Sequence, residues 1–264
     1  MAIRRVNQTI RSFDNGPSVL ANMARGRLMT DPGELVFRTG NLSIVTPNRP
    51  GARLPVYELF VEDSYSLAWF TAGLTAPTIV DIGAHVGCFS LAVADQLPGS
   101  HVTSFEATPS TFEYLERNVV GNAMEDRISI HATAVSGAAG TIEFAETGTG
   151  SGHNGVLHLG SPGTTTIRVP SVTMRDAFDL AGRPVDVVKI DAEGAEYDMI
   201  LSSSAEDWLP VRRVVMEYHG VEGHSWKELE SFFEATGLRV AGHDFGPNGY
   251  GMAWLSRDEI GSRP

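Results

Sequence analysis

The segment Thr78–Gly87 reads TIVDIGAHVG, a short apolar run followed by a turn that contains two glycines. The run predicts a buried strand, and the residues after the turn predict a helix over Cys88–Gln96. Glycines between a strand and a helix let the backbone turn tightly and approach a ligand. Their spacing is G-x-x-x-G, and His85 stands between Gly83 and Gly87, so the G-x-G-x-x-G fingerprint of dinucleotide-binding proteins is missing. The segment therefore predicts an open α/β sheet with a ligand site at the end of this strand.

Outward from this segment, strand-like and helix-like stretches alternate. Further strands are expected at Val102–Phe105, Ile128–Val135, Val185–Ile190 and Arg213–Glu217, and helices at Thr111–Asn122, Tyr197–Leu201 and Trp226–Thr236. Such alternation predicts parallel strands with helices on both faces of the sheet. The last two expected strands, Leu238–His243 and Tyr250–Ser256, are separated only by a short turn, so we expect them to be antiparallel.

An acidic residue, Glu106, follows the second expected strand. A carboxylate at this position can accept hydrogen bonds from both hydroxyls of a ribose. The arrangement suits NAD and S-adenosylmethionine equally well. Ala107, in the turn that follows, offers an apolar surface that can support an adenine.

Three carboxylates follow the fourth expected strand in the segment KIDAEGAE, which runs from Lys189 to Glu196. Like charges this close repel one another, which points to a nearby cation such as Lys189, a sulfonium or a metal ion. We expect Asp191 and Glu193 to project into a cleft at the end of the strand. The alternative is a helix that begins with acidic residues, which the helix dipole favours.

Glu217 and His219 follow the fifth expected strand, which should lie beside the fourth and so bring them near Asp191. A histidine beside carboxylates has a raised pKa and can act as a base near neutral pH. We therefore expect Asp191 or His219 to remove a proton from a substrate, with Glu193 or Glu217 orienting the base. The pattern assigns no metal ion to these side chains.

The first part of the chain differs in charge from the rest. Residues 1–53 hold eight arginines and three acidic residues, a net charge of +5, which leaves −17 for the remainder. Two interpretations are open: a solvated surface element, or an arm that covers the substrate site or meets another subunit. We expect an arm over residues 1–75 and a catalytic domain over residues 76–264.

Within the arm, Glu34–Thr39 and Leu42–Thr46 predict a β-hairpin around Gly40 and Asn41. The stretch Val56–Ala72 predicts one or two helices, and Tyr65 within it is a candidate to cap a cofactor.

A long excursion, Ser136–Leu180, separates the third and fourth expected strands. It contains residues 147–163, rich in Gly, Ser and Thr, between the strand-like runs Thr141–Phe144 and Thr166–Val169. Long loops of this kind are often functional.

Composition sets the broad class. The 264 residues are 42% hydrophobic and 20% charged, which permits a sizeable core and excludes global disorder. The net charge of −12 argues against a nucleic acid as the main partner. The single cysteine, Cys88, excludes an internal disulfide and a cysteine-based zinc site.

No apolar run could span a membrane and no signal peptide is visible, so we expect a cytoplasmic protein. A strong preference for Arg over Lys suggests a bacterial source.

Together these segments resemble the FkbM-type family of S-adenosylmethionine-dependent methyltransferases. The matching stretches, between about residues 55 and 256, are TIVDIGAHVGCFSL, VTSFEATPSTFEYLERNVVGN, HATAVS, VDVVKIDAEGAEYDMIL and VVMEYHG. KIDAEGAE is the more specific motif, and DIGAHVG is less so. The resemblance implies a class I, Rossmann-like α/β sheet of seven strands, the last of them antiparallel, with the cofactor bound over the first three strand ends.

The resemblance also assigns residues to each part of S-adenosylmethionine. Its methionine and ribose would lie against Gly83, Ala84, His85 and Gly87, a loop that Asp81 would orient. Glu106 would hold the ribose hydroxyls. The adenine would lie among Ala107, Ala134 and Val135, and Asp191 would lie near the methyl group. Family members usually methylate an oxygen of a small molecule or sugar, often in natural-product biosynthesis.

Two other classes of function stay open. A NAD-dependent oxidoreductase could use the same Glu106, but it predicts the missing G-x-G-x-x-G turn. A non-catalytic cofactor-binding module would keep the fold, and the acidic residues that chemistry needs argue against it. For the methyltransferase we expect a small-molecule methyl acceptor, no nucleic acid, no membrane, and an arm available for homo-oligomer contacts.

Overall fold

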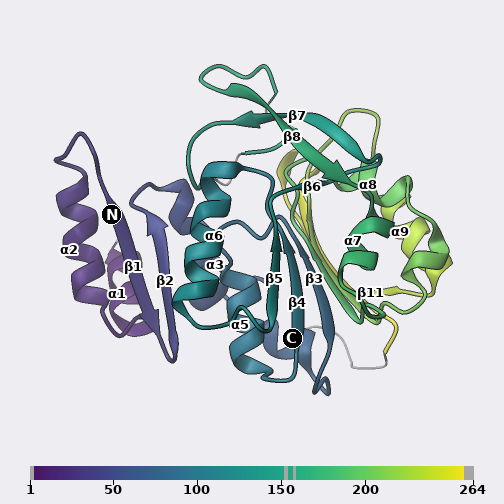
Figure 1. The fold of residues 1–264 in the computed structure, drawn as a ribbon, viewed down its shortest axis with the longest axis horizontal. Helices are drawn as coiled ribbons and strands as arrows, with labels where there is room; N and C mark the ends of the chain where they lie inside the picture. The colour runs from purple at the N-terminus through teal and green to yellow at the C-terminus, as the bar shows by residue number, and fades with distance from the viewer. Residues whose placement is uncertain (1–2, 152–153, 157–158, 259–264) are drawn as a thin grey trace.

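A seven-stranded sheet forms the centre of the computed structural model, which describes residues 3–151, 154–156 and 159–258. Its order is β11-β12-β10-β9-β3-β4-β5 (Figure 1). The strands are β3 Thr78–Ile82, β4 His101–Phe105, β5 Ile128–His131, β9 Val187–Ile190, β10 Arg213–Tyr218, β11 Arg239–Phe245 and β12 Gly251–Ser256. Strand β12 is antiparallel to both of its neighbours, whereas the other pairs are parallel. The predicted sheet, with its last strand antiparallel, is confirmed.

The third strand is shorter than predicted. The expected strand Ile128–Val135 ends as β5 at His131, whose carbonyl accepts the N–H of Glu106 at 3.1 Å. Strand β4 stops at Phe105, so the chain beyond His131 has no further partner in the central sheet. It turns away and pairs as β6, Ala134–Val135, with another strand. The prediction was wrong here because the alternation of apolar and polar residues continues through a change of sheet.

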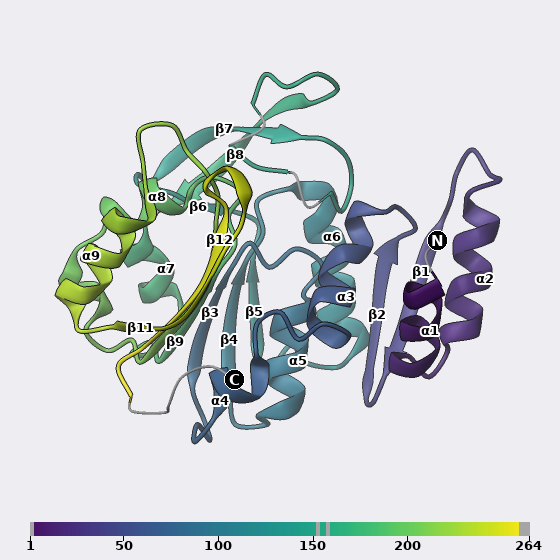
Figure 2. The ribbon, with the colours of Figure 1, turned by 180° about the vertical axis from the view of Figure 1, so that it is seen from behind.

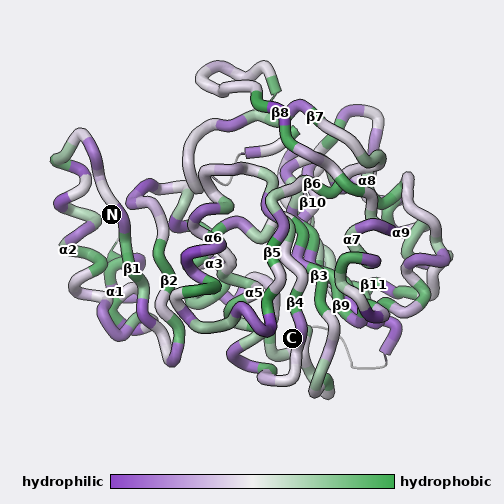
Figure 3. Tube along the Cα trace, in the orientation of Figure 1, coloured by the Kyte–Doolittle hydropathy of each residue, from purple (hydrophilic) through white to green (hydrophobic). Residues whose placement is uncertain are grey.

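Helices cover both faces of the sheet (Figures 1 and 2). One group comprises α3 Leu54–Phe60, α4 Leu67–Thr71, α5 Cys88–Gln96 and α6 Pro109–Gly121; the other comprises α7 Met174–Leu180, α8 Glu196–Leu201 and α9 Trp226–Thr236. Side chains on β3 alternate between the two cores: Ile79 packs with the first group, and Val80 and Ile82 with the second. Hydrophobic residues, drawn in green, gather along β3 and β9 in Figure 3. None of the described helices is long and apolar enough to cross a membrane.

The excursion after β5 forms a second, three-stranded sheet in the order β6-β8-β7. Its other strands are β7 Gly140–Glu146 and β8 Thr165–Val172, so the two strand-like runs predicted there are confirmed. Below it, α7 begins with a capping box in which Thr173 and Asp176 exchange hydrogen bonds. The small sheet lies across the end of the central sheet (Figure 1).

The arm folds as two helices and a hairpin: α1 Ile3–Ser12, α2 Gly16–Gly26, β1 Glu34–Thr39 and β2 Leu42–Pro47. Three short 3-10 helices complete the fold: η1 Gly51–Arg53, η2 Ala205–Trp208 and η3 Pro247–Gly249. The predicted hairpin is confirmed, and so are the two helices α3 and α4 within Val56–Ala72.

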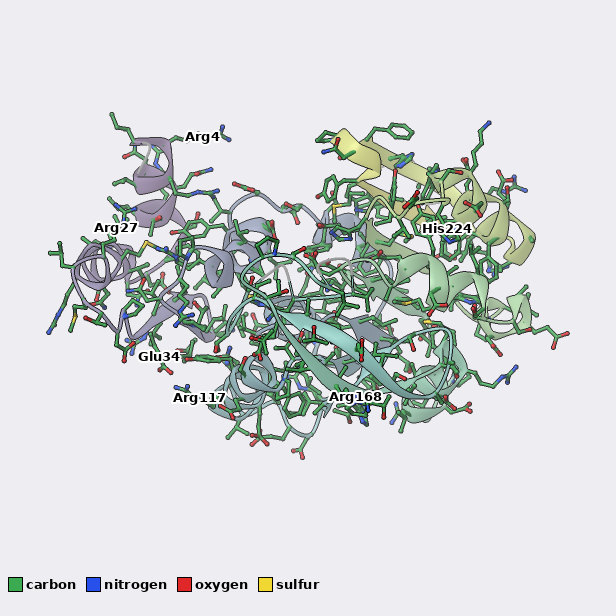
Figure 4. The ribbon with its side chains drawn as sticks, turned by 90° about the horizontal axis from the view of Figure 1, so that it is seen from above. Arg4, Arg27, Glu34, Arg117, Arg168 and His224 are labelled. Carbon is green, nitrogen blue, oxygen red and sulfur yellow. The ribbon has the colours of Figure 1, made fainter. Side chains whose placement is uncertain are left out.

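The hairpin docks on α6 through polar contacts. The Asn118 amide donates to the Val45 carbonyl at 2.9 Å and accepts the Val45 N–H at 2.7 Å. Asn122 binds the backbone of Ser43 in the same two-way manner. At the surface Arg117 pairs with Glu34 at 2.6 Å, and the two side chains lie together in Figure 4. The arm is therefore fixed to the core beside the glycine-containing loop after β3, where Asn118 also donates to the Val86 carbonyl at 2.8 Å.

Candidate active site

A cavity of about 350 Å³ lies at the carboxyl ends of the central strands. Most of the predicted site residues line it: Gly83, His85, Glu106, Ala107, Ala134, Val135, Asp191, Glu193, Glu217 and His219. They converge because β3, β4, β9 and β10 end at the same edge of the sheet. Part of the remaining wall comes from Ile142 and Phe144 of the small sheet.

Asp81, Ala84, Gly87 and Tyr65 do not line this cavity. Ala84 is buried within the loop, and Gly87 caps α5 with a φ of +89°, where an added Cβ would press on Leu115. Tyr65 lies between α3 and α4 and lines a second cavity of about 280 Å³. Its hydroxyl donates to Asp191 at 3.3 Å. Direct contact of Tyr65, Ala84 and Gly87 with a cofactor stays a prediction, and for Asp81 the predicted role was to orient the loop.

Asp81 holds the glycine loop indirectly. It is fully buried, accepts a hydrogen bond from Ser90 and pairs with the Lys189 ammonium at 3.2 Å. Lys189 in turn donates to the carbonyls of Gly83 at 2.7 Å and Ile82 at 3.2 Å. Burial opposes the charge of Lys189, but Asp81 and Asp191 outweigh it and raise its pKa. A buried ion pair thus ties β3 and β9 to the loop.

Gly83 has no room for a side chain. Its φ is +71°, and an added Cβ would overlap the carbonyl oxygen of Asp191. The loop after β3 and the acidic segment after β9 are consequently in backbone contact. His85, also at a positive φ of +54°, turns its backbone N–H to Glu106 at 3.0 Å.

Glu106 joins the ends of β3 and β4. One carboxylate oxygen accepts the His85 N–H, and the other accepts the Thr108 N–H at 2.8 Å. Burial raises the pKa of Glu106, and these N–H donors offset part of the rise. Each oxygen can accept a second hydrogen bond, so the carboxylate remains able to take two hydroxyl donors from the cavity.

The His85 ring is neutral and has an open acceptor. Its Nε2 lies 3.0 Å from the Gly150 carbonyl, which can only accept, so Nε2 carries the hydrogen. Burial lowers the pKa of His85 to about 4. In the part of the chain that the structure describes, its Nδ1 is buried and has no hydrogen-bond partner.

The acidic segment after β9 surrounds His219. Glu196 is fully buried, and its carboxylate accepts the N–H groups of Ala192 and Gly194. It lies 3.2 Å from His219 Nδ1, while Nε2 lies 3.6 Å from Glu193 and 3.5 Å from Glu217.

Burial and the mutual charges of these side chains shift the pKa values of His219, Glu193 and Glu217. Burial alone would lower the pKa of His219, but Glu196, Glu217 and Glu193 outweigh it and raise it to about 11. Burial and the charge of Asp191 raise the pKa of Glu193 to about 8, and the same causes raise that of Glu217. The raised pKa favours the imidazolium form of His219 in the free protein, and Asp191 or His219 as the base stays a prediction.

Sequence reasoning missed two residues of the cavity. Glu58 of α3 lines both cavities, and burial together with Glu217 and Asp191 raises its pKa to about 7. Tyr250, which precedes β12, also lines both. Glu58 lies in the same predicted helical stretch as Tyr65, so the sequence could have indicated it. Tyr250 reaches the cavity only because β12 runs antiparallel to β10 and begins at this edge of the sheet.

The strand order, the antiparallel β12 and a cavity over the strand ends define a class I, Rossmann-like methyltransferase fold. A crystal structure of the METTL16 MTase domain is similar in fold, with a TM-score of 0.50, 17% identity, and coverage of 83% of this chain and 74% of that one.

The Methyltransferase FkbM domain model matches residues 81–240. The chain belongs to the FkbM methyltransferase family. "Methyltransferase sdnD" of Sordaria araneosa is 23% identical over 88% of this chain and 99% of its own. "31-O-demethyl-FK506 methyltransferase FkbM" of Streptomyces tacrolimicus is 25% identical over 74% of this chain and 85% of its own. The resemblance noted from the sequence motifs is confirmed.

Proposed function

We propose that this methyltransferase uses S-adenosylmethionine to methylate a hydroxyl oxygen of a small molecule. The observation that carries the proposal is the junction of Glu106 with the glycine loop, which opens on the same cavity as the carboxylates of β9 and β10. One end of the cavity thus suits a nucleoside, and the other holds groups that can accept a proton.

The residues present fit the cofactor. Glu106 would accept the ribose hydroxyls, and Ala107, Ala134 and Val135 offer apolar surface for the adenine. When bound, S-adenosylmethionine supplies a methyl group already activated by its sulfonium.

At the other end of the cavity, the protein's task is to orient the acceptor and remove its proton. We assign contact with the acceptor to Asp191, at the end of β9, with Glu193, Glu217 and His219 around it. A base placed in this way contributes about 10²–10⁴-fold to rate. Alignment of the reacting atoms contributes more, about 7–11 kcal/mol.

The charge of the cavity favours a neutral acceptor. Among the described residues that line it, none is Lys or Arg, and four are Glu or Asp at the acceptor end: Glu58, Asp191, Glu193 and Glu217. Phosphates and polyanionic nucleic acids would meet repulsion here. The printed name of the Streptomyces tacrolimicus relative supports a natural-product hydroxyl as the acceptor class.

We propose further that residues 76–264 form the catalytic domain and that the arm, residues 1–75, serves as its cap. The contribution of Leu54 and Glu58 to the cavity wall supports the cap. Pairing of two copies through the arm, a cytoplasmic location and a bacterial source stay predictions.

Incubation with isotopically labelled S-adenosylmethionine and a panel of hydroxylated metabolites tests the reaction. Mass spectrometry should show a labelled product in which the added methyl is on oxygen, and Asp191→Asn should lower its rate by about 10²-fold or more. A labelled product methylated on nitrogen, or equal rates for the variant, would contradict this assignment.

A further inference from the structure

Three side chains at the ends of β9 and β10 converge within the cavity. Asp191, Glu217 and His219 each offer a ligand atom, and these atoms all lie within 4.8 Å of one another. The strand register explains the convergence, because Ile190 of β9 pairs with Met216 of β10, and the two ligands Asp191 and Glu217 follow directly.

The orientation of His219 is fixed from outside this group. Two backbone N–H groups donate to the Glu196 carboxylate and hold it in place. The same carboxylate accepts a hydrogen bond from His219 Nδ1 at 3.2 Å. Nε2 is thereby directed toward Glu217 and Glu193. A buried carboxylate behind one ring nitrogen is the arrangement that orients metal-binding histidines and fixes their tautomer.

The separations at Nε2 suit a shared cation better than hydrogen bonds. Nε2 lies 3.5 Å from Glu217 and 3.6 Å from Glu193, beyond the 2.7–3.2 Å of an N–H···O bond. Two ligand atoms bound to one cation at about 2.1 Å lie about 3.0–3.4 Å apart, so the separation of Nε2 from Glu217 needs only a small contraction, whereas the 4.8 Å limit for the whole set leaves Asp191 a larger movement.

Acidic side chains outnumber cationic ones at this place, even with His219 counted as an imidazolium. The carboxylates of Asp191, Glu193, Glu217 and Glu58 face the cavity. Lys189 is a nearby cation, but it is held by Asp81 and two backbone carbonyls and stays 3.8 Å from Asp191. A divalent cation would compensate this excess and take the place of the proton on Nε2.

We infer that Asp191, Glu217 and His219 form a binding site for one divalent first-row transition-metal ion. One imidazole nitrogen with two carboxylates favours Mn²⁺, Fe²⁺, Co²⁺ or Zn²⁺ over Ca²⁺ and Mg²⁺, which prefer oxygen ligands. Protein supplies three ligands, so further coordination positions stay open toward the cavity. There a cation would lower the pKa of an acceptor hydroxyl; this consequence, unlike the binding itself, rests on the proposed methyl transfer.

Titration with Mn²⁺, followed by the electron paramagnetic resonance signal of the free ion, tests the site. The full chain is first treated with a chelator and then transferred to chelator-free buffer. We expect saturable loss of signal equivalent to one Mn²⁺ per chain, and competition by Zn²⁺. Asp191→Asn, Glu217→Gln and His219→Gln should each weaken binding by more than about tenfold.

His224→Gln is the matched control, since His224 also faces a carboxylate, Glu228 at 3.4 Å, but on the surface. It should bind Mn²⁺ like the wild type. Thermal melting checks each variant, and Asp191 and Glu217, which are less buried than His219, carry the test if His219→Gln does not fold. Absence of saturable binding at millimolar Mn²⁺, or wild-type affinity in folded Asp191 and Glu217 variants, would overturn the proposal. The titration contains no methyl donor, so its failure is distinct from failure to bind the cofactor.

Discussion

Glu106 accepts the backbone N–H of His85 at 3.0 Å, which joins the strand-end acid of β4 to the glycine loop of β3. The two motifs are 21 residues apart in the chain. This hydrogen bond requires the positive φ of His85, and the Glu106 residue that accepts it is only 7% exposed.

Gly83→Ala should destabilise the fold and abolish cofactor binding, because the added methyl group would overlap the Asp191 carbonyl. Clash and strain together should lower the free energy of unfolding by more than about 2 kcal/mol. Urea denaturation measures the loss. Gly182→Ala is the control, since Gly182 has a similar φ of +67° with open space around it, and it should lose only about 1–2 kcal/mol. Equal losses in the two variants would show that the contact with Asp191 is unimportant.

Lys189→Met should destabilise the protein by about 3–5 kcal/mol, because it leaves the fully buried Asp81 carboxylate without its cation. The double variant with Asp81→Asn should recover part of this loss, since the uncompensated charge is then gone. Chemical denaturation of the two single variants and the double variant gives the coupling energy. Additive losses would contradict an interaction between the two side chains.

Asn118→Ala should detach the hairpin of the arm from α6. Asn118 is 1% exposed and makes hydrogen bonds to Val45 and to the carbonyl of Val86, so its removal leaves buried backbone groups unpaired. The expected loss is about 1–3 kcal/mol of unfolding free energy. Faster proteolysis within residues 1–53 would report the same loosening, and resistance equal to the wild type would argue against it.

The Glu34–Arg117 pair should contribute little, and only while Glu34 is ionised. Hydrogen bonding to Arg117 holds the pKa of Glu34 below its usual value. Its contribution is therefore present above the unfolded-state pKa and is lost as the pH falls through the lower folded-state pKa. Both side chains are exposed, so Glu34→Gln should cost only about 0.2–1 kcal/mol at pH 7. The difference between wild type and variant should shrink in acid; a difference that grows in acid would refute the pairing.

Sequence patterns were sufficient for the central sheet because its strands are short apolar runs bounded by glycines and acids, such as TIVDIG at β3. They failed at Ile128–Val135, where an unbroken alternation of apolar and polar residues passes from one sheet to another at His131. Pairing stops where the neighbouring strand β4 ends, and the local sequence of residues 128–135 gives no information about that end.

The site was predictable where strand ends determine it, as for Glu106, Asp191 and Glu217. The position of Tyr65 was not predictable, because the helical pattern of Val56–Ala72 hides a turn in which Asp63 and Ser66 adopt positive φ. The raised pKa of His219 depends on the three carboxylates that surround it in the folded protein, those of Glu196, Glu193 and Glu217. Tertiary packing brings these side chains together, and their spacing in the sequence does not predict it.

Calorimetric titration with S-adenosylhomocysteine tests the central claim most directly. The wild type should bind one equivalent, and Glu106→Ala should bind more than about tenfold more weakly, since two charge-assisted hydrogen bonds to the ribose are lost. Glu143→Ala, which removes an exposed carboxylate of β7, should bind like the wild type. No binding by the wild type at millimolar ligand would contradict the account, as would unchanged affinity in Glu106→Ala.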